Sequence, residues 1–364
     1  MKNPFKFGSV VSGCYFTNRV EEIAKINSIL QSANHLIIIS PRRFGKTSLI
    51  KKVTEKIKRP TIYLDLQLVT SPEDLAAQLL KKLYKSFPIE KLKHSIKNFR
   101  ILPTISLNPI NNEVDIAFQP VHSSFLLIED VFNLIENVSK LKEKIIIVLD
   151  EFQEIRNIAK NLDKQLRSII QHHKKVNYVF LGSQESLMRD IFEKKKSPFY
   201  HFGFLLLLDK ISYDNFYKYL IKGFSKITKD AKEISENILE FTNSHPYYTQ
   251  QLAFTTFELL LKEKNINKAV EDAIDLIVRT HDNDFERLWQ ILNRTDMKLL
   301  IGMTETDITP LSAEFSIKNQ IGPSSTIFSS IKRLQQKGIV IKTNNGYEID
   351  DPFFSVWIKI RRKM

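Results

Sequence analysis

The sequence predicts an α/β fold built on a mostly parallel sheet, followed by a helical region and a small C-terminal unit. Through the first 211 residues, short β-branched runs alternate with amphipathic stretches, which is typical of a parallel sheet covered by helices on both faces. From residue 212 onward the apolar pattern is helical, until a turn signal at Asn344-Asn345-Gly346 joins two short β-type segments. We therefore expect a core over residues 1–211, a helical lid over 212–283 and a C-terminal unit over 284–364.

Composition limits the classes of function. The 364 residues are 43% apolar and 26% charged, as in an ordinary globular chain of two or three domains. The single cysteine, Cys14, excludes a disulfide framework and a cysteine-based zinc site. Because no apolar run could span a bilayer and the N-terminus lacks the apolar centre of a signal peptide, we expect a cytoplasmic protein with no membrane partner. The net charge of +13 favours a polyanionic partner only modestly, since the lysines are spread along the chain.

The first elements follow from capping and burial patterns. Thr17 or Asn18 is expected to cap a helix from about Arg19 to Gln31, and the run at 37–39 predicts the first strand. Residues 37–39 are followed by a loop with the sequence Ser40-Pro41-Arg42-Arg43-Phe44-Gly45-Lys46-Thr47-Ser48. An amphipathic helix opens at the end of this loop.

A strand, a loop ending in Gly-Lys-Thr and a helix together predict a phosphate-binding site. Backbone N–H groups of such a loop bind phosphate oxygens, and Gly45 lets the backbone approach closely. Lys46 would supply a charge to the β- and γ-phosphates, and the Thr47 hydroxyl would bind Mg²⁺. The pattern normally begins with glycine where this chain has Ser40, so we expect a variant of the loop. Arg42 and Arg43 would contact either phosphates or a partner carboxylate, or form a solvated face.

A second strand, a helix and an insertion come next. Residues 61–66 predict the second strand, with Asp65 at its end favoured as a cap of the next loop, and Ser71 caps a helix to about Ser86. Residues 101–120 contain two short β-type segments, which we interpret as an inserted two-stranded ribbon. The ribbon is either an interaction arm or an edge decoration, and the sequence leaves both open.

A pair of carboxylates completes the predicted site. Five apolar residues, 145–149, lead directly into Asp150-Glu151, and a buried parallel strand would place both at the carboxyl edge of the sheet. We expect Asp150 to hold Mg²⁺, directly or through a water, and Glu151 to polarise the attacking water. The fourth strand, about 177–182, ends at Ser183-Gln184, and residues 204–211 predict the fifth.

The lid and the C-terminal unit are predicted from helical periodicity. Lid helices are expected at about 213–226, 231–243, 246–263 and 267–279, the third beginning at Pro246, where the missing N–H costs nothing. A helix over 284–303, two shorter helices and the β-hairpin then give the order of a winged helix-turn-helix.

The winged helix has two open interpretations. DNA phosphates would be contacted by Ser324, Ser325, Lys332 and Arg333. Equally, the unit is a nucleotide-dependent clamp or a protein-docking surface, because acidic residues at 348, 350 and 351 offset the positive charge of the wing.

Five motifs, over about residues 5–290, resemble the archaeal-type ATPases of the STAND group, relatives of the AAA+ P-loop ATPases. The motifs are Phe16-x-x-Arg19-x-x-Glu22, the loop 40–49, Leu149-Asp150-Glu151-Phe152-Gln153, Gly182-Ser183-Gln184 and His245-Pro246-Tyr247-Tyr248. The resemblance implies a P-loop fold of the additional-strand type, with a five-stranded sheet in the order 5-1-4-3-2, a helical lid and a winged helix that closes over nucleotide. It also implies that Ser183 or Gln184 senses the γ-phosphate, that Pro246 lines the base or ribose pocket, and that the Arg19 segment borders the adenine.

One departure from the family pattern bears on turnover. Relatives often have Tyr-Gly-Arg where this chain has His201-Phe202-Gly203, so the arginine expected to reach a neighbouring subunit's γ-phosphate is missing. Arg189 is a weak substitute for it.

Two hypotheses of function follow. In the first, the protein is a Mg²⁺-dependent ATPase that uses Lys46, Thr47, Asp150 and Glu151 and works as a slow conformational switch. In the second, it is a nucleotide-gated regulator that binds DNA or protein with little or no hydrolysis. A kinase is disfavoured, because an Asp-Glu pair directly after a strand favours water activation. ATP is favoured over GTP, because the sequence contains no Asn-Lys-x-Asp motif that would recognise guanine. A protein partner or a homo-oligomer is also possible, and the sequence does not identify either.

Overall fold

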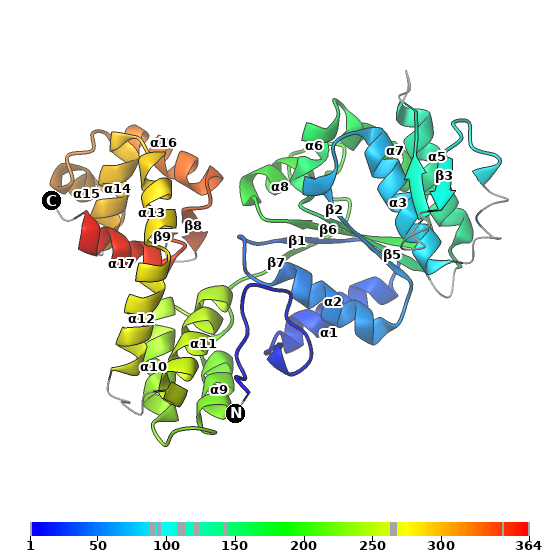
Figure 1. The fold of residues 1–364 in the computed structure, drawn as a ribbon. Helices are drawn as coiled ribbons and strands as arrows, with labels where there is room; N and C mark the ends of the chain where they lie inside the picture. The colour runs from blue at the N-terminus through cyan, green and yellow to red at the C-terminus, as the bar shows by residue number, and fades with distance from the viewer. Residues whose placement is uncertain are drawn as a thin grey trace. The chain divides into compact units, whose positions relative to one another are not determined.

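The computed structural model describes residues 2–87, 92, 96–107, 114–119, 124–140, 144–262, 268–306, 308–343 and 346–362 (Figure 1). Contacts divide the chain into two compact units. The core unit is Arg19–Ser40 with Lys46–Asp209, and the C-terminal unit is Met1–Asn18, Pro41–Gly45 and Lys210–Met364. The division into 1–211, 212–283 and 284–364 stays a prediction. In the described ranges, none of the helices combines the length and apolar character needed to span a bilayer.

A parallel sheet forms the centre of the core unit. In the part of the chain that the structure describes, its strand order is β2 (Thr61–Asp65), β5 (Ile145–Asp150), β6 (Val176–Gly182), β1 (Leu36–Ile39) and β7 (Phe204–Leu207). Numbered among themselves along the chain, these strands give 5-1-4-3-2 from the other edge, which confirms the expected order. The apolar runs of β1, β5 and β6 are buried along their whole length, as strands covered on both faces must be.

Strand register brings the predicted polar residues to one edge. Asp65 lies opposite Asp150, and Ile39 lies opposite Gly182. Because all these strands are parallel, their carboxyl ends and the residues that follow them, including Glu151 and Ser183, meet at the same edge of the sheet.

Helices cover both faces of this sheet (Figure 1). Helices α1 (Val20–Gln31) and α2 (Lys46–Ile57) lie on one face. The other face carries α3 (Pro72–Ser86), α5 (Ser124–Val138), α6 (Ile155–Ile158), α7 (Leu162–Ile170) and α8 (Glu185–Phe192). The predicted cap of α3 is confirmed, since Ser71 Oγ accepts from Asp74 N at 3.1 Å.

The predicted cap of α1 is wrong by one or two residues. Arg19, and not Thr17 or Asn18, occupies the N-cap position of α1. Asn18 and Arg19 both have left-handed backbones, with φ of 56° and 64°, and this turn sends the chain into the helix one residue later than the capping pattern suggested.

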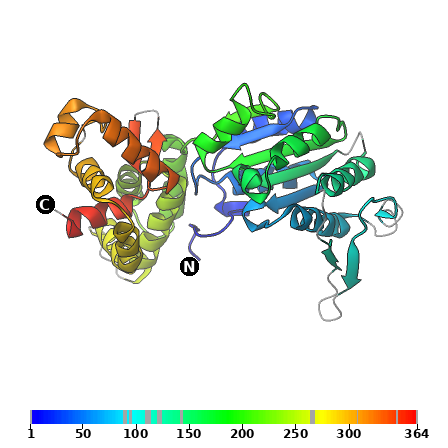
Figure 2. The same cartoon turned by 90° about the horizontal axis from the view of Figure 1, so that it is seen from above.

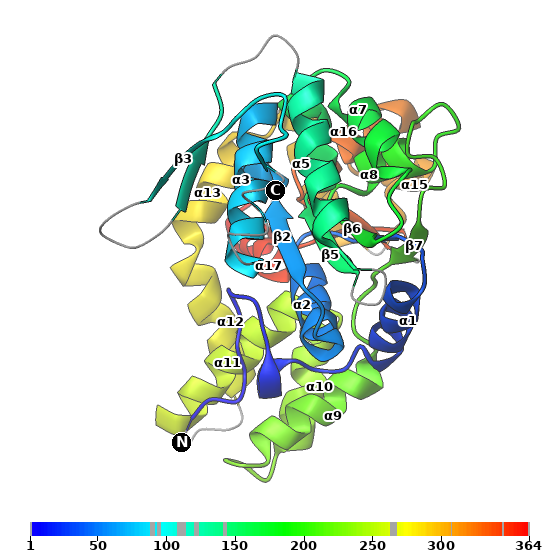
Figure 3. The ribbon, with the colours of Figure 1, turned by 90° about the vertical axis from the view of Figure 1, so that its right-hand side faces the viewer.

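Strands β3 (Thr104–Leu107) and β4 (Val114–Ala117) pair antiparallel into a separate ribbon, with Thr104 opposite Ala117. The ribbon lies beside α3 (Figures 2 and 3), and Lys81 of that helix forms an ion pair of 3.0 Å with Asp115. Its tip, residues 108–113, lies outside the described residues.

The C-terminal unit is built around one apolar cluster. Its lid helices are α9 (Tyr213–Phe224), α10 (Ala231–Thr242), α11 (Pro246–Lys262) and α12 (Ala269–Thr280). The winged helix follows with α13 (Asp282–Gln290), α14 (Arg294–Glu305), α15 (Ala313–Lys318), α16 (Ser324–Gln336), β8 (Val340–Thr343), β9 (Gly346–Ile349) and α17 (Pro352–Arg361). The hairpin pairs Thr343 with Gly346, while Asn344 and Asn345 of its predicted turn lie outside the described residues. The helix expected over 284–303 is divided, because Asn293 caps α14 through a 2.8 Å bond from Asp296 N.

The N-terminal segment packs on the lid, which its loop-like sequence did not indicate. Phe5 is 1% exposed and contacts the rings of Phe224 and Phe257. A Cβ on Gly223 would come within 2.3 Å of the Phe5 ring, so this glycine makes room for the segment. Asn3 Nδ2 donates to Glu258 Oε1 at 2.8 Å and fixes the chain start along α11.

Candidate nucleotide site

The loop between β1 and α2 has the backbone that its sequence predicts. Gly45 has φ of +88° and Arg43 has φ of +65°. Among the described atoms, a Cβ on Gly45 would meet nothing within 4 Å, so within the protein it is the positive φ that favours glycine at this position. Left-handed residues in a short loop turn successive N–H groups toward one point, which forms a concavity for an anion.

Lys46 is held at the start of this loop by Ser40, the residue that stands in place of glycine. Lys46 is 6% exposed, and its Nζ lies 3.0 Å from the Ser40 carbonyl oxygen and 3.4 Å from Ser40 Oγ. The ammonium group is therefore buried at the edge of the sheet, where a phosphate group would compete for it.

Two hydroxyl groups, from two different elements, converge on Asp150. The Thr47 hydroxyl at the start of α2 donates to Asp150 Oδ2 at 3.0 Å, and the Tyr63 hydroxyl from β2 donates to the same oxygen. Tyr63 Oη also lies 3.3 Å from Thr47 Oγ1. A carboxylate beside a hydroxyl is a donor set that suits Mg²⁺, which prefers oxygen ligands and keeps several waters. The chemistry of Thr47 and Asp150 thus fits the metal predicted for them.

Burial raises the pKa of Asp150, and the nearby charge of Glu151 raises it further, while the hydrogen bond from Thr47 and the charge of Lys46 lower it. The net shift is upward. Ionising the Asp150 carboxyl therefore costs more in the folded, metal-free protein than in the unfolded chain, and a bound cation would offset that cost.

Asp150→Asn is expected to raise the thermal stability of the metal-free protein at pH 8. Because the folded-state pKa of Asp150 is raised, its contribution to stability is present at low pH and is lost as pH rises through that pKa. Asparagine cannot ionise, and the hydroxyls of Thr47 and Tyr63 can turn to accept from its amide. Thermal unfolding in EDTA across pH 4 to 8 checks this, with the two proteins converging at the acid end. A variant less stable than the wild type at pH 8 would contradict the prediction.

Glu151 lies beside the residue that follows β6. Its Oε2 accepts from Ser183 Oγ at 2.6 Å, from Ser183 N at 3.3 Å and from Gln153 Nε2 at 2.5 Å. Glu151 itself has a left-handed backbone with φ of 51°, which lets the chain turn sharply after β5. Of the two predicted sensor residues, the structure thus brings Ser183 to Glu151, while Gln184 is half-buried at the N-cap position of α8.

Other predicted residues lie in separate groups. Arg19 is 5% exposed, pairs with Glu22 at 2.8 Å and donates to the Asp209 carbonyl at 2.6 Å, so it joins α1 to the chain after β7. Asp65 Oδ1 accepts from Gln67 N at 3.0 Å, which confirms its capping role. Arg189 pairs with Glu185 and Glu193 of its own region.

The remaining site predictions fall in the C-terminal unit. Arg43 donates to the Tyr248 hydroxyl at 2.9 Å, whereas Arg42 is exposed and Pro41 is half-buried. Pro246 is half-buried at the start of α11. On α16, Ser324, Ser325 and Lys332 are exposed, while Arg333 pairs with the buried Asp296 at 2.7 Å.

Sequence reasoning missed Tyr63 and Gln153. Tyr63 lies two residues before Asp65 on β2, so strand alternation places it on the same side as that aspartate and could have suggested it. Gln153 lies in the turn after Glu151, and nothing in its local pattern predicts its contact with that carboxylate.

Tyr63→Phe is expected to raise the Mg²⁺ concentration needed for half-maximal phosphate release by about fivefold, since one typical hydrogen bond is worth roughly 1 kcal/mol. The lost bond would leave the Asp150 carboxylate less well oriented toward the metal. A Mg²⁺ titration at saturating ATP measures the shift. Tyr213→Phe, which removes a hydroxyl from a 46% exposed lid residue, is the matched control and should behave as the wild type.

Comparisons with known proteins agree with this geometry. Residues 16–252 match a family model described as an ATPase domain predominantly from Archaea, and residues 283–360 match one described as "Probable winged helix domain". A comparison with curated protein sequences gives no match.

Solved structures show the same fold. A Walker-type ATPase of Pyrococcus abyssi has 17% identity and a TM-score of 0.66, over 95% of this chain and 96% of that chain. The Aeropyrum pernix Orc1 protein, solved in complex with DNA, has 12% identity and a TM-score of 0.50, over 94% of this chain and 91% of that chain. With its family model covering residues 16–252, the chain belongs to the family of ATPase domains found predominantly in Archaea, with a winged-helix domain after it.

Proposed function

We propose that the protein binds ATP with Mg²⁺ and hydrolyses it slowly to ADP and phosphate, as a conformational switch. The observation that carries the proposal is the pair of hydrogen-bonded groups at one edge of the sheet. Thr47 lies 3.0 Å from Asp150, and Ser183 lies 2.6 Å from Glu151. Phosphoryl transfer to water requires residues that hold the metal, here Thr47 and Asp150, next to residues that orient the attacking water and sense the phosphate, here Glu151 and Ser183.

The chain's own residues would share the work in the following way. The backbone N–H groups of residues 40–48 would bind phosphate oxygens, with Lys46 leaving Ser40 for the β- and γ-phosphates. Thr47 and Asp150 would hold Mg²⁺, which when bound offsets the charge of the triphosphate. Glu151 would accept a proton from the attacking water, in an orientation fixed by Ser183 and Gln153.

The proposed position of the adenine base of ATP is taken from the resemblance to the family. Arg19 and Pro246 are proposed to border the adenine and the base or ribose pocket. Arg19 contacts Glu22 and the Asp209 carbonyl, which supports a role in shaping the segment around the adenine and not in binding phosphate.

Slow turnover is part of the proposal. The position where relatives often carry an arginine is filled here by His201-Phe202-Gly203, and Arg189 is paired with glutamates at 2.8 Å. An arginine that stabilises the transition state raises kcat by about 10³- to 10⁵-fold. A chain without it is therefore expected to hydrolyse ATP slowly, as suits a conformational switch.

The test is phosphate release from ATP by the purified full chain, with Mg²⁺ or with EDTA, alongside equilibrium binding of a fluorescent ATP analogue. We expect release only with Mg²⁺, and loss of both binding and release in Lys46→Ala. Binding without release, even with DNA added, would instead support the alternative, a nucleotide-gated DNA- or protein-binding regulator. Absence of binding would reject both.

DNA is the partner that the C-terminal surface best supports. Ser324, Ser325 and Lys332 are exposed on α16, and the chain carries a net charge of +13. The fold neighbour from Aeropyrum pernix was solved in complex with DNA. Fluorescence anisotropy with duplex DNA at two salt concentrations would test this, since phosphate contacts weaken steeply with salt.

A further inference from the structure

Two side chains of the phosphate loop, Arg43 and Phe44, contact the lid. Their partners lie in the lid turn, defined here as residues 243–248. A loop of this kind binds an anion through its backbone N–H groups, so its side chains can serve other contacts.

Arg43 is held by two tyrosines of this turn. Its Nη1 donates to the Tyr248 hydroxyl at 2.9 Å, and its guanidinium lies 4.6 Å from the centre of the Tyr247 ring. Tyr248 is 2% exposed, and burial raises its pKa, with Asp351 and Asp350 raising it further while Arg43 lowers it. The Tyr248 hydroxyl therefore stays protonated between a cation on one side and carboxylates on the other.

Phe44 reaches the same turn through His245. The two rings meet edge to face with centroids 4.8 Å apart, and both residues are buried. His245 Nδ1 accepts from Tyr247 N at 3.2 Å, and His245 Nε2 lies 3.3 Å from Asp350 Oδ1.

Carboxylates of the winged helix form the next layer. Asp351 Oδ1 accepts from Phe353 N at 2.9 Å and Phe354 N at 3.2 Å, and so caps α17. Burial raises the pKa of Asp351, whereas these amides and the charge of Arg43 lower it. Arg43 and Asp351 also line one cavity of about 410 Å³.

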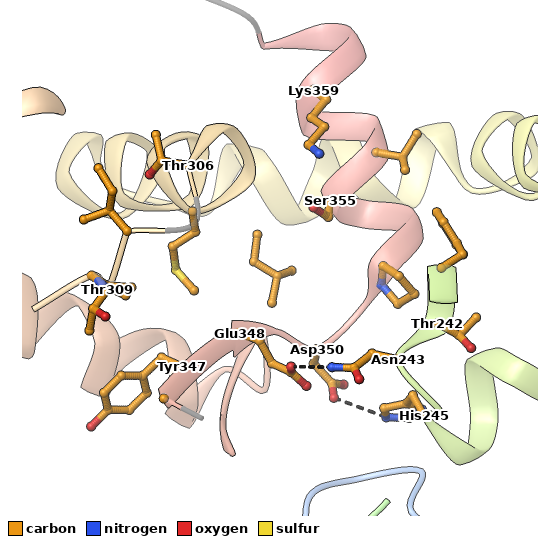
Figure 4. Close-up of a pocket in the computed structure, with 18 of the residues that line it drawn as sticks. Thr242, Asn243, His245, Thr306, Thr309, Tyr347, Glu348, Asp350, Ser355 and Lys359 are labelled. Atoms are coloured by element: carbon orange, nitrogen blue, oxygen red, sulfur yellow. Dashed lines mark hydrogen bonds and ion pairs between the residues drawn. The ribbon is translucent and has the colours of Figure 1, made fainter. Parts of the chain in front are cut away.

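A second set of contacts joins the wing to the lid. Figure 4 shows Glu348 with Asn243, and Asp350 with His245, along a cavity of about 430 Å³. Lys210, at the start of the lid segment, pairs with Glu348 at 2.5 Å. The lid turn is thus bonded to the phosphate loop on one side and to the wing and α17 on the other.

We propose that Arg43 and Phe44 are the read-out face of the phosphate loop, through which nucleotide binding is coupled to the winged helix by way of the lid turn and Asp350–Asp351. The inference rests on the proposed nucleotide binding and names its regulation. Coupling between two sites is reciprocal. If nucleotide binding changes the conformational equilibrium of the winged helix, a change in that equilibrium must change nucleotide affinity by the same factor. Neither side chain needs to touch the nucleotide for this.

The chain contains its own probe for the test. Both of its tryptophans, Trp289 in α13 and Trp357 in α17, are buried in the winged helix. Tryptophan fluorescence of the full chain, titrated with Mg²⁺ and a slowly hydrolysed ATP analogue, therefore follows the winged helix. A fluorescent ATP analogue measures binding separately.

Tyr248→Phe removes the hydroxyl that Arg43 binds and keeps the ring. We expect it to lose at least half of the nucleotide-dependent tryptophan signal and to bind nucleotide about three- to tenfold more weakly, the range that one typical hydrogen bond accounts for. Tyr247→Phe is the matched control, because it also loses one hydroxyl but keeps the ring under Arg43, and it should match the wild type.

Asp351→Asn supplies a second variant if Tyr248→Phe fails to fold, since asparagine still caps α17 while the charge near Arg43 is removed. It too should lose most of the signal. Wild-type binding and wild-type signal in either folded variant would overturn the proposal. If the wild type binds the analogue but its tryptophan signal does not change, only this coupling fails. If the wild type binds no nucleotide, the proposed function fails as well.

Discussion

Glu151→Gln is expected to lower the rate of ATP hydrolysis by about 10²- to 10⁴-fold, the usual contribution of a positioned general base, while ATP binding is retained. Glutamine has nearly the same shape and still offers an oxygen to Ser183 Oγ, which lies 2.6 Å from Glu151 Oε2 in the wild type. It cannot take a proton from water, so the loss would appear in kcat and not in KM. Single-turnover phosphate release and binding of a fluorescent ATP analogue measure the two effects separately.

Glu154→Gln is the matched control, since it removes a carboxylate three residues further on, which accepts from Asn157 Nδ2 at 2.7 Å. It should hydrolyse ATP at the wild-type rate. Hydrolysis within twofold of wild type in Glu151→Gln would assign the proton transfer to another group and would leave Glu151 as a residue that only orders the turn after β5. If neither the wild type nor the variants release phosphate while all bind ATP, the regulator hypothesis is supported.

The parts of the site that follow buried strands could be predicted from the sequence. Thr47 and Asp150 are 103 residues apart, yet they form a hydrogen bond, because parallel strands with continuous apolar runs must end at one edge of their sheet. The same reasoning places Ser183 after β6, next to Glu151. For these residues a local pattern, repeated strand by strand, is sufficient.

Contacts that depend on where one side chain meets a distant element could not be predicted in this way. The alternation along β2 predicts on which face of the sheet Tyr63 lies, but it does not predict the contact of Tyr63 with Asp150. The packing of Phe5 on the lid depends on Gly223, which lies far along the chain and has no periodic signature. Arg43 is similar: its sequence neighbours indicate contact with phosphate, whereas in the structure it donates a hydrogen bond to Tyr248, 205 residues away. Long-range pairing of this kind follows from the assembled fold and not from local propensity.

Arg333 was a candidate for DNA contact, and its position in α16 gives it a structural partner as well. Asp296 of α14 is 1% exposed, and its carboxylate accepts from Arg333 Nη2 at 2.7 Å and from the Ser330 hydroxyl. A buried carboxylate is tolerated only when it is paired and hydrogen-bonded. The Arg333 side chain is 41% exposed, so its interaction with Asp296 is partly screened by water.

Arg333→Met is expected to lower the free energy of unfolding of the winged helix by about 2 kcal/mol, at the lower end for a broken buried pair because Arg333 is partly exposed. Asp296→Asn in the same chain should restore at least half of the loss, since the remaining partner no longer carries a charge. Lys332→Met, one residue away and exposed, should stay within about 0.5 kcal/mol of wild type. Urea unfolding followed by tryptophan fluorescence reports all three, because Trp289 and Trp357 both lie in this domain.

If Arg333→Met unfolds like Lys332→Met, the guanidinium contributes little to the fold and remains free for a DNA phosphate. If the loss appears as expected, weaker DNA binding by Arg333→Met would reflect a damaged domain, and Lys332 becomes the residue with which to test DNA contact.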